Sequence, residues 1–304
     1  MNPPIFQPLT GIYEPSAVQQ LPDGRFLVVE DEKQHPFSVF SLGTDGTVRS
    51  SPVGPDSPDD DPVFWKLDDL EALALDPAGL ICAITSHSRN GDGEEKKSRH
   101  KLVRFRLEGD RVVDRRVVTG LKPALVAAHP VLAAAAEIVD VKADGGFNIE
   151  ALEFSVDRQR LLIGLRSPLL DNRAIVASVE NPTAMFETDE PPRIATTLET
   201  LDLDGNGIRG MCHVAALGGY LVVGGPVARQ PVQFQLWFWS GDRGAPTRRV
   251  TVAGLPGFEH AEGVSPAVID GRQKIVVVSD DGSREEGRCA RYLLLDPEQL
   301  RIAP

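Results

Sequence analysis

The chain has 304 residues, of which 44 are acidic and 32 are basic, giving a formal net charge of −12. This surplus of negative charge repels phosphate backbones and anionic lipids, which argues against a general nucleic-acid or membrane binder. Cys82, Cys212 and Cys289 are odd in number and widely spaced, which argues against a disulfide framework or a cysteine zinc site. The sequence shows neither a leader-like start nor a long apolar run, so we expect a soluble, cytoplasmic protein. We expect it to be monomeric or weakly oligomeric.

A short motif recurs five times, and its spacing predicts the fold. Each copy has a polar, a small and an apolar residue, followed after a turn by a β-rich run. Alternating segments after each run supply a third strand and, in most units, a fourth. Except for one longer interval, the copies recur every 53 to 59 residues, which predicts an all-β, five-bladed β-propeller over residues 1–304. The polar positions of the five copies are Ser16, Glu71, Glu150, Arg209 and Glu262.

Two departures from this spacing predict further features. The interval between Glu71 and Glu150 is 79 residues, and its alanine and leucine content favours a short helical insertion at about 121–143. The fifth unit lacks a convincing fourth strand, whereas the segment 5–9 has no partner. We therefore expect the N-terminal strand to close the ring by pairing with blade five. The other fourth strands are expected at 48–51, 111–118, 193–198 and 248–252.

The repeat also predicts where polar groups meet. In an antiparallel hairpin, the start of the first strand lies beside the end of the second strand. If the first strands line the propeller axis, the five polar positions converge around the central opening. The second strands of the blades end near them, with the candidate site residues Asp31, His87, Arg166 and Asp280.

Three converging glutamates would repel one another unless positive charge is supplied. One source is a divalent cation such as Ca²⁺, which binds oxygen ligands; the expected ligands are Ser16, Glu71, Glu150 and Glu262. The other source is Arg209, which could instead tie the inner strands together in a structural network. Both alternatives stay open at this stage.

The same residues predict a site for a small anionic molecule carrying phosphate or carboxylate. In a hydrolase acting on ester or phosphoester bonds, Glu71, Glu150 and Glu262 would position water, and His87 would serve as general base. A binding propeller without catalysis, for a ligand or a protein partner, is the alternative. The planar guanidinium group of arginine is suited to such anions. The expected substrate-binding residues are Arg209, Arg166, Arg89, Arg173, Asp31 and Asp280.

The motifs resemble two kinds of propeller. The inner-strand motifs around Ser16, Glu71, Glu150 and Glu262 resemble those of five-bladed calcium-activated nucleotidases (apyrases), and more loosely those of esterase-like phytases. That resemblance implies a central Ca²⁺ held by one serine or glutamate per blade, although Arg209 replaces a serine. A broader resemblance is to a bacterial β-propeller family known only as a domain of unknown function. It rests on Ser86–Arg89, Asn148–Leu152, Gly164–Pro168 and Gly207–Gly210.

Overall fold

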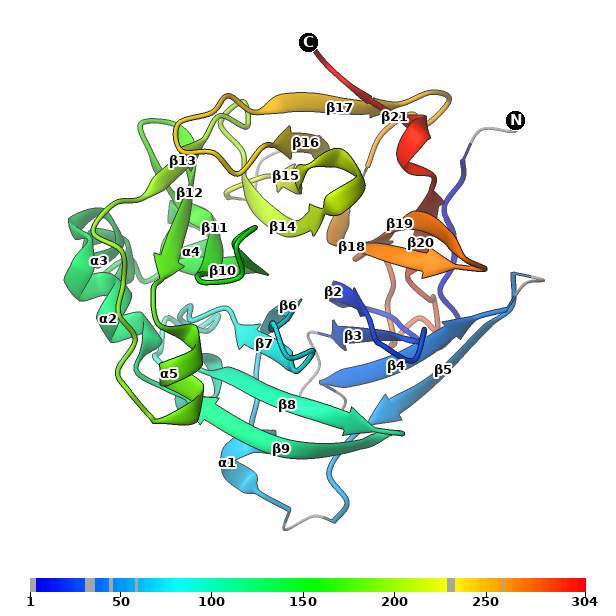
Figure 1. Ribbon diagram of the computed structural model, residues 1–304. Coiled ribbons are helices and arrows are strands. Elements are labelled where there is room, and N and C mark those ends of the chain that lie inside the picture. Colours follow the sequence, from blue (N-terminus) through cyan, green and yellow to red (C-terminus); the bar gives the residue numbers. More distant parts are fainter. Residues whose placement is uncertain (1–3, 31–35, 44–45, 58–59, 229–232, 259) are drawn as a thin grey trace.

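The computed structural model describes residues 4–30, 36–43, 46–57, 60–228, 233–258 and 260–304. Five antiparallel sheets surround a central axis, as Figure 1 shows, which confirms the five-bladed propeller. The innermost strands of blades one to five are β2 (Pro15–Gln20), β6 (Leu70–Leu75), β10 (Asn148–Phe154), β14 (Gly207–Val214) and β18 (Ala261–Ile269). The second strands are β3 (Phe26–Glu30), β7 (Ile81–Thr85), β11 (Leu161–Leu170), β15 (Gly219–Gly225) and β19 (Arg272–Ser279).

The outer strands complete the blades. The third strands are β4 (Phe37–Leu42), β8 (Leu102–Glu108), β12 (Arg173–Val179), β16 (Gln235–Trp239) and β20 (Arg291–Leu295). The fourth strands are β5 (Val48–Val53), β9 (Arg111–Val118), β13 (Glu199–Leu201), β17 (Arg248–Val252) and, in blade five, β1 (Gln7–Pro8). A further strand, β21 (Leu300–Ile302), adds a fifth member to blade four.

The N-terminal strand closes the ring as expected. Gln7 pairs with Tyr292 and Pro8 with Arg291, so β1 is the outer strand of blade five. The chain then turns inward, where Leu9 is fully buried and its amide donates to the Ala290 carbonyl at 2.7 Å. The segment that leads into blade one is therefore held in blade five by hydrogen bonds, which closes the ring.

The predicted position of the fourth strand of blade three is wrong. The expected strand at 193–198 makes only a bridge between Ile194 and Val179, and the ladder of blade three resumes at β13. The segment follows helix α5 (Pro182–Glu187) and two consecutive prolines, Pro191 and Pro192. Proline has no amide hydrogen to give to a ladder, so regular pairing starts later.

The helical insertion is present, with α2 (Leu121–Ala128), α3 (Pro130–Ala136) and α4 (Val141–Asp144); the remaining helix, α1 (Pro62–Trp65), is a single turn. Three 3-10 turns lie at Lys97–Arg99, Ala215–Leu217 and Pro297–Gln299. Leu121, Leu125 and Leu132 are fully buried and pack against Ile149 and Ile163 of blade three. The insertion is thus anchored on the side of the propeller.

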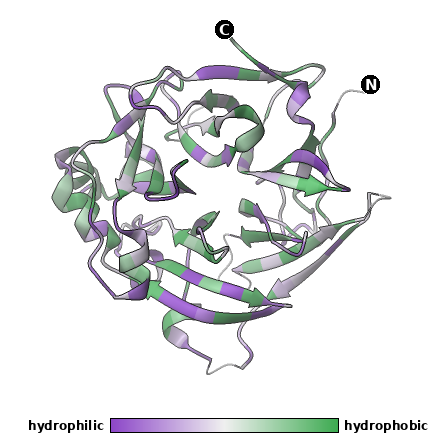
Figure 2. Ribbon diagram, in the orientation of Figure 1, coloured by the Kyte–Doolittle hydropathy of each residue, from purple (hydrophilic) through white to green (hydrophobic). Residues whose placement is uncertain are grey.

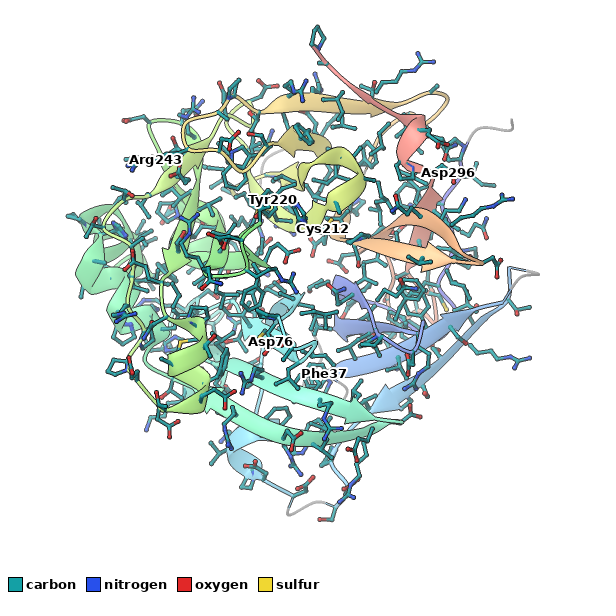
Figure 3. All side chains as sticks on the ribbon, in the orientation of Figure 1. Phe37, Asp76, Cys212, Tyr220, Arg243 and Asp296 are labelled. Atoms are coloured by element: carbon teal, nitrogen blue, oxygen red, sulfur yellow. The ribbon has the colours of Figure 1, made fainter. Side chains whose placement is uncertain are left out.

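The hydrophobic core lies between neighbouring blades. Phe37 of blade one packs on Phe105 of blade two, with ring centroids 5.0 Å apart. Figure 2 shows apolar colouring on inner strands and more hydrophilic colouring on outer strands such as β9 and β17. In Figure 3, Tyr220 lies toward the middle of the molecule and Arg243 at its periphery. Strands that stack face to face between two blades need apolar residues on both faces, so only the outer strands alternate freely with polar residues.

Cys82 and Cys212 are buried free thiols, whereas Cys289 is partly exposed. In the described part of the chain, no helix has the length and apolar character needed to span a membrane.

Candidate functional site

Each polar residue of the repeat is the extra residue of a β-bulge. In blade one, Pro15 pairs with Glu30 and Ala17 pairs with Val29, so Ser16 has no partner across the ladder. A bulge bends the strand locally and re-aims the side chain of the extra residue. The same one-residue shift recurs at Glu71, Glu150, Arg209 and Glu262, and we call these five residues the axial ring.

In blades four and five, the residue that follows the ring position is a glycine, and the spacing of the inner strands requires it. A Cβ added to Gly210 would lie 2.0 Å from the carbonyl oxygen of Glu262 in the next blade. A Cβ on Gly263 would lie 2.8 Å from the amide nitrogen of Val18. Neighbouring first strands therefore approach one another too closely at these two positions for any larger residue.

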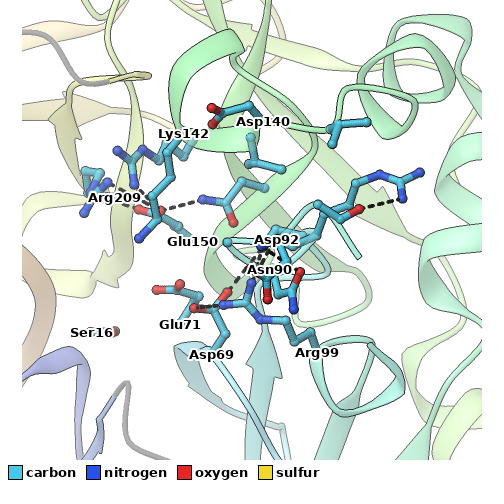
Figure 4. Close-up of a pocket in the computed structure, with 18 of the residues that line it drawn as sticks. Ser16, Asp69, Glu71, Asn90, Asp92, Arg99, Asp140, Lys142, Glu150 and Arg209 are labelled. Atoms are coloured by element: carbon cyan, nitrogen blue, oxygen red, sulfur yellow. Dashed lines mark hydrogen bonds and ion pairs between the residues drawn. The ribbon is translucent and has the colours of Figure 1, made fainter. Parts of the chain in front are cut away.

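The axial ring lines a cavity of about 500 Å³ at one end of the axis (Figure 4). On the other side of the ring the axis narrows to a space of only about 10 Å³, lined by the first strands. Since that is about the room of a single water molecule, a small-molecule ligand fits only on the wide side of the ring. The cavity wall consists of the loop at 88–93, the insertion at 139–142, and Asp69, Arg99, Asn148, Arg166 and Asp280.

Arg209 holds two ring glutamates from neighbouring blades. Its Nε lies 2.9 Å from Glu150 Oε2, and its Nη2 contacts Glu262 Oε1. Arg166 Nη1 lies 3.1 Å from Glu150 Oε1, and Asn148 Nδ2 donates to that same oxygen at 2.8 Å. Burial lowers the pKa of the Arg209 guanidinium, and the Glu150 carboxylate opposes this shift. Blades three, four and five are thus joined at the axis by charge-assisted hydrogen bonds.

This geometry does not fit the expected calcium ligands. The Arg209 guanidinium occupies the carboxylate oxygens of Glu150 and Glu262 that a cation would need. Within the described ranges, no group of three or more Asp, Glu, His or Cys residues is arranged to hold a metal ion. We therefore assign no step of a reaction to a metal at the axial ring.

A second polar cluster forms the opposite wall. Arg99 Nη2 lies 2.5 Å from Asp69 Oδ1, and Ser88 Oγ donates to Asp69 Oδ2 at 3.3 Å. Arg89 donates through Nε and Nη2 to the carbonyl of Ala136, at 3.3 Å each. The loop of blade two is therefore attached to the helical insertion, and together they form the rim of the cavity.

Two charged groups on the side of Arg209 and Glu150 stand apart from these networks. Among the described residues, Lys142 of α4 makes no ion pair, and Figure 4 shows it on the side of Arg209 and Glu150. Asp280 follows the end of β19, and its carboxylate receives no hydrogen bond from the described part of the chain. Burial raises the pKa of Asp280, although the nearby Arg209 opposes the shift. Near Arg209, Lys142 and Asp280 are therefore the charged groups that can pair with a ligand.

The structure brings together most of the expected site residues. Those lining the cavity are Ser16, Glu71, Glu150, Glu262, Arg209, Arg166, Arg89 and Asp280. Asp31 lies outside the described residues. Two expected residues, His87 and Arg173, do not join the site.

His87 is a correction to the expected general base. It is fully buried, its Nδ1 lies 2.8 Å from the Thr85 carbonyl, and its ring stacks on His100. Burial lowers the pKa of His87 to about 3. Its backbone is left-handed, with φ of 55°, and the following residue, Ser88, lines the cavity in its place. The strand end lies on the expected face, but the His87 side chain does not reach the cavity.

Arg173 is the second correction. It begins β12, a third strand, and donates to Thr200 in the neighbouring fourth strand, at 3.1 Å to both Oγ1 and the carbonyl. Third strands lie away from the axis, so a residue there does not reach the central cavity. Its nearness in sequence to Arg166 misled the prediction.

Sequence reasoning missed several residues of the wall. Asp69 and Asn148 had a usable signal, because each is the polar first residue of a repeat copy. The others lie in loops that have no counterpart in other blades, so no pattern marked them. The missed residues are Asp69, Ser88, Asn90, Asp92, Arg99, Asp140, Lys142 and Asn148.

Comparison with solved structures finds other proteins of low sequence identity. One is a Thermus thermophilus protein that is provisionally named an oxidoreductase (glucose dehydrogenase). It is 17% identical, the match covers 96% of this chain and 100% of that chain, and the TM-score is 0.49. The PQQ-bound aldose sugar dehydrogenase of Streptomyces coelicolor is 15% identical, with 96% and 98% covered and a TM-score of 0.46. The Malassezia sympodialis allergen Mala s 1 is 14% identical, with 94% and 78% covered and a TM-score of 0.45. At these scores nothing in the names is transferred to this chain.

No curated protein matches the sequence significantly. The narrower resemblance to calcium-activated nucleotidases and phytases gains no support from these comparisons, whereas the broader one does. The model of a family described as "protein of unknown function (DUF3616)" matches residues 134–292, which is more than half of the chain. The chain therefore belongs to the DUF3616 family.

Proposed function

We propose that the axial cavity binds a small anionic molecule, with a phosphate or carboxylate group, and acts on it as a hydrolase of ester or phosphoester bonds. The observation that carries the proposal is one cavity of about 500 Å³ that contains both an available cation, Lys142, and a partly buried carboxyl group, Asp280. Cavities of roughly 300–1,000 Å³ are typical of sites for single small molecules. The size thus favours a metabolite over a polymer.

Lys142 supports binding of the acidic group. Its ammonium offers three hydrogen-bond donors, and no described carboxylate pairs with it. The cavity wall as a whole has seven carboxylates and five cationic side chains, a surplus of two negative charges. An acidic group is therefore expected to bind close to Lys142.

Asp280 supports proton transfer. Burial raises its pKa toward the working range of a general base. In the proposed step, the Asp280 carboxylate takes a proton from water as the water oxygen bonds to the acyl carbon or phosphorus. The ester bond from that atom to the leaving oxygen breaks, and the leaving oxygen receives the proton. Acid and alcohol are released, and Asp280 returns to its ionised form.

A second candidate is a binding propeller without catalysis. It is favoured by the guanidinium groups of the wall, since each is already engaged by a protein acceptor. Arg209 pairs with Glu150 and Glu262, Arg99 with Asp69, and Arg89 with a backbone carbonyl. A site whose cations are held by the protein is rigid, which suits recognition with or without a reaction.

The test combines a panel of carboxylic and phosphoric esters with two variants. Asp280→Asn should lower kcat by about 10²–10⁴-fold with ligand affinity retained, because it removes the general base but keeps the shape. Lys142→Ala should weaken binding of the acidic group and raise KM. Asp270→Asn, in an exposed turn outside the cavity, and Lys66→Ala, an exposed lysine also outside it, are matched controls.

The outcomes separate the candidates. Binding that depends on Lys142, without turnover of any ester, would favour the binding propeller. Binding and turnover that are unaffected by both cavity variants would contradict the proposed site.

A further inference from the structure

Asn148 has a buried acceptor that no described residue of the protein uses. The residue opens β10, lines the axial cavity and is only 6% exposed. Its Nδ2 donates to Glu150 Oε1 at 2.8 Å. Because an ionised carboxylate only accepts hydrogen bonds, the amide nitrogen must face Glu150, and this fixes the orientation of the amide. Asn148 Oδ1 is left without a hydrogen-bond partner among the described residues.

A buried acceptor without a partner is costly, and native proteins contain few of them. Asn148 lines the cavity, so a ligand that moves the groups covering Oδ1 by a small amount can supply the missing partner. The Asp280 carboxylate, which lines the same cavity, also receives no hydrogen bond from the described residues. A ligand that brings hydrogen-bond donors to this end of the cavity would satisfy both groups.

The surroundings of Asn148 decide what kind of donor fits. The carboxylate oxygen that receives its Nδ2 also lies 3.1 Å from Arg166 Nη1 and 3.4 Å from Arg209 Nη1. Two guanidinium groups therefore surround the Glu150 carboxylate that Asn148 contacts. An ammonium group beside Asn148 would have to compete with them for the Glu150 carboxylate, whereas a neutral hydroxyl needs no counter-charge.

We propose that the substrate is a hydroxylated acid, whose hydroxyl group donates to Asn148 Oδ1 and whose carboxylate or phosphate lies toward Lys142. The inference rests on the proposed function and adds the substrate class. Asn148 is then a specificity-determining residue, and a plain aliphatic acid of the same length is a poor ligand because it leaves the acceptor unpaired.

The experiment measures binding of matched probes to the full-length wild-type protein by isothermal titration calorimetry. Gluconate is compared with hexanoate, glucose 6-phosphate with hexyl phosphate, and 2-aminohexanoate tests the ammonium alternative. We expect each hydroxylated probe to bind at least about tenfold more tightly than its deoxygenated partner, because the partner lacks the donor. The two pairs also show whether the acid is a carboxylate or a phosphate.

Two variants locate the effect. Asn148→Leu, similar in volume but without an acceptor, should bring the affinity ratio within each pair close to one. Lys142→Ala should weaken both members of a pair by the same factor and leave the ratio unchanged. If Asn148→Leu fails to fold, the ratios for the wild-type protein still decide the question.

The outcomes distinguish the two proposals. Equal affinity within both pairs, or tighter binding of 2-aminohexanoate than of gluconate, would overturn the hydroxylated-acid inference while leaving the anion site intact. Absence of binding by every probe would remove the anion site, and the inference with it.

Discussion

The floor and the rim of the axial cavity are built in opposite ways. The floor is the axial ring, made five times by the same bulge, and three of its four charged members, Glu150, Glu262 and Arg209, are buried and paired with one another. The rim is made once, by the blade-two loop and the helical insertion, and residues such as Asp92 and Lys142 are exposed. The difference indicates that the floor holds the blades together, whereas the rim determines what enters.

The substitution expected to have the largest effect is Glu150→Ala, which tests whether the floor holds the blades together. The substitution leaves the buried charge of Arg209 and the partly buried charge of Arg166 without their shared carboxylate. We expect a loss of about 3–5 kcal/mol in the free energy of unfolding, the range for breaking a buried ion pair on one side. Urea denaturation measures it, with Ser16→Ala as the control in an uncharged ring position. A loss of less than about 1 kcal/mol would show that the floor is not a structural network.

Gly210→Ala tests the spacing of the floor rather than its charge. The new methyl group would collide with the Glu262 carbonyl, so neighbouring inner strands must shift. We expect a loss of about 1–3 kcal/mol, as for other overpacked sites. Thermal and urea unfolding should show no comparable loss for Gly54→Ala, where a Cβ meets nothing within 4 Å. Equal stability of the two variants would argue against tight packing at the axis.

Glu153 can be compared with the glutamates of the floor, because it is a buried carboxylate without their guanidinium partners. It accepts hydrogen bonds from the amides of Phe154 and His213, and burial raises its pKa to about 7. A raised pKa in the folded state gives stability that is complete below the ordinary value of 4.5 and is lost as the pH rises through about 7.

Urea unfolding at pH 5, 6, 7 and 8 should show this loss, with a contribution of at most about 1.4 kcal/mol per pH unit. In Glu153→Gln the group no longer titrates, so the difference in stability between variant and wild type should change with pH in this window. A constant difference across the four pH values would refute the assignment to Glu153.

The smallest effect on stability is expected in the rim. Lys142 is exposed and makes no ion pair within the described residues, so Lys142→Ala should change the free energy of unfolding by no more than about 0.5 kcal/mol. The same variant should weaken binding of acidic ligands, as measured by calorimetry. A large loss of stability would show that the rim, like the floor, is structural.

The fold and the floor could be predicted from the sequence, because both follow from a local pattern that repeats. The order of polar, small and apolar residues around Glu71 or Glu150 reflects the bulge and the close strands of one blade, and each blade repeats it. The closing strand β1 was predictable for a similar reason, since blade five lacked one member.

Only the tertiary structure decided how the groups at the axis are used. The placement of Arg209 between Glu150 and Glu262, which does not fit calcium, depends on three strands far apart in sequence. The inward position of His87 depends on a left-handed backbone at a strand end, and the rim depends on contacts such as Arg89 with Ala136. The sequence by itself determined five equivalent blades and which side chains face the axis. Which of those charges neutralise one another, and which stay available to a ligand, was decided by contacts between blades and loops that share no repeating pattern.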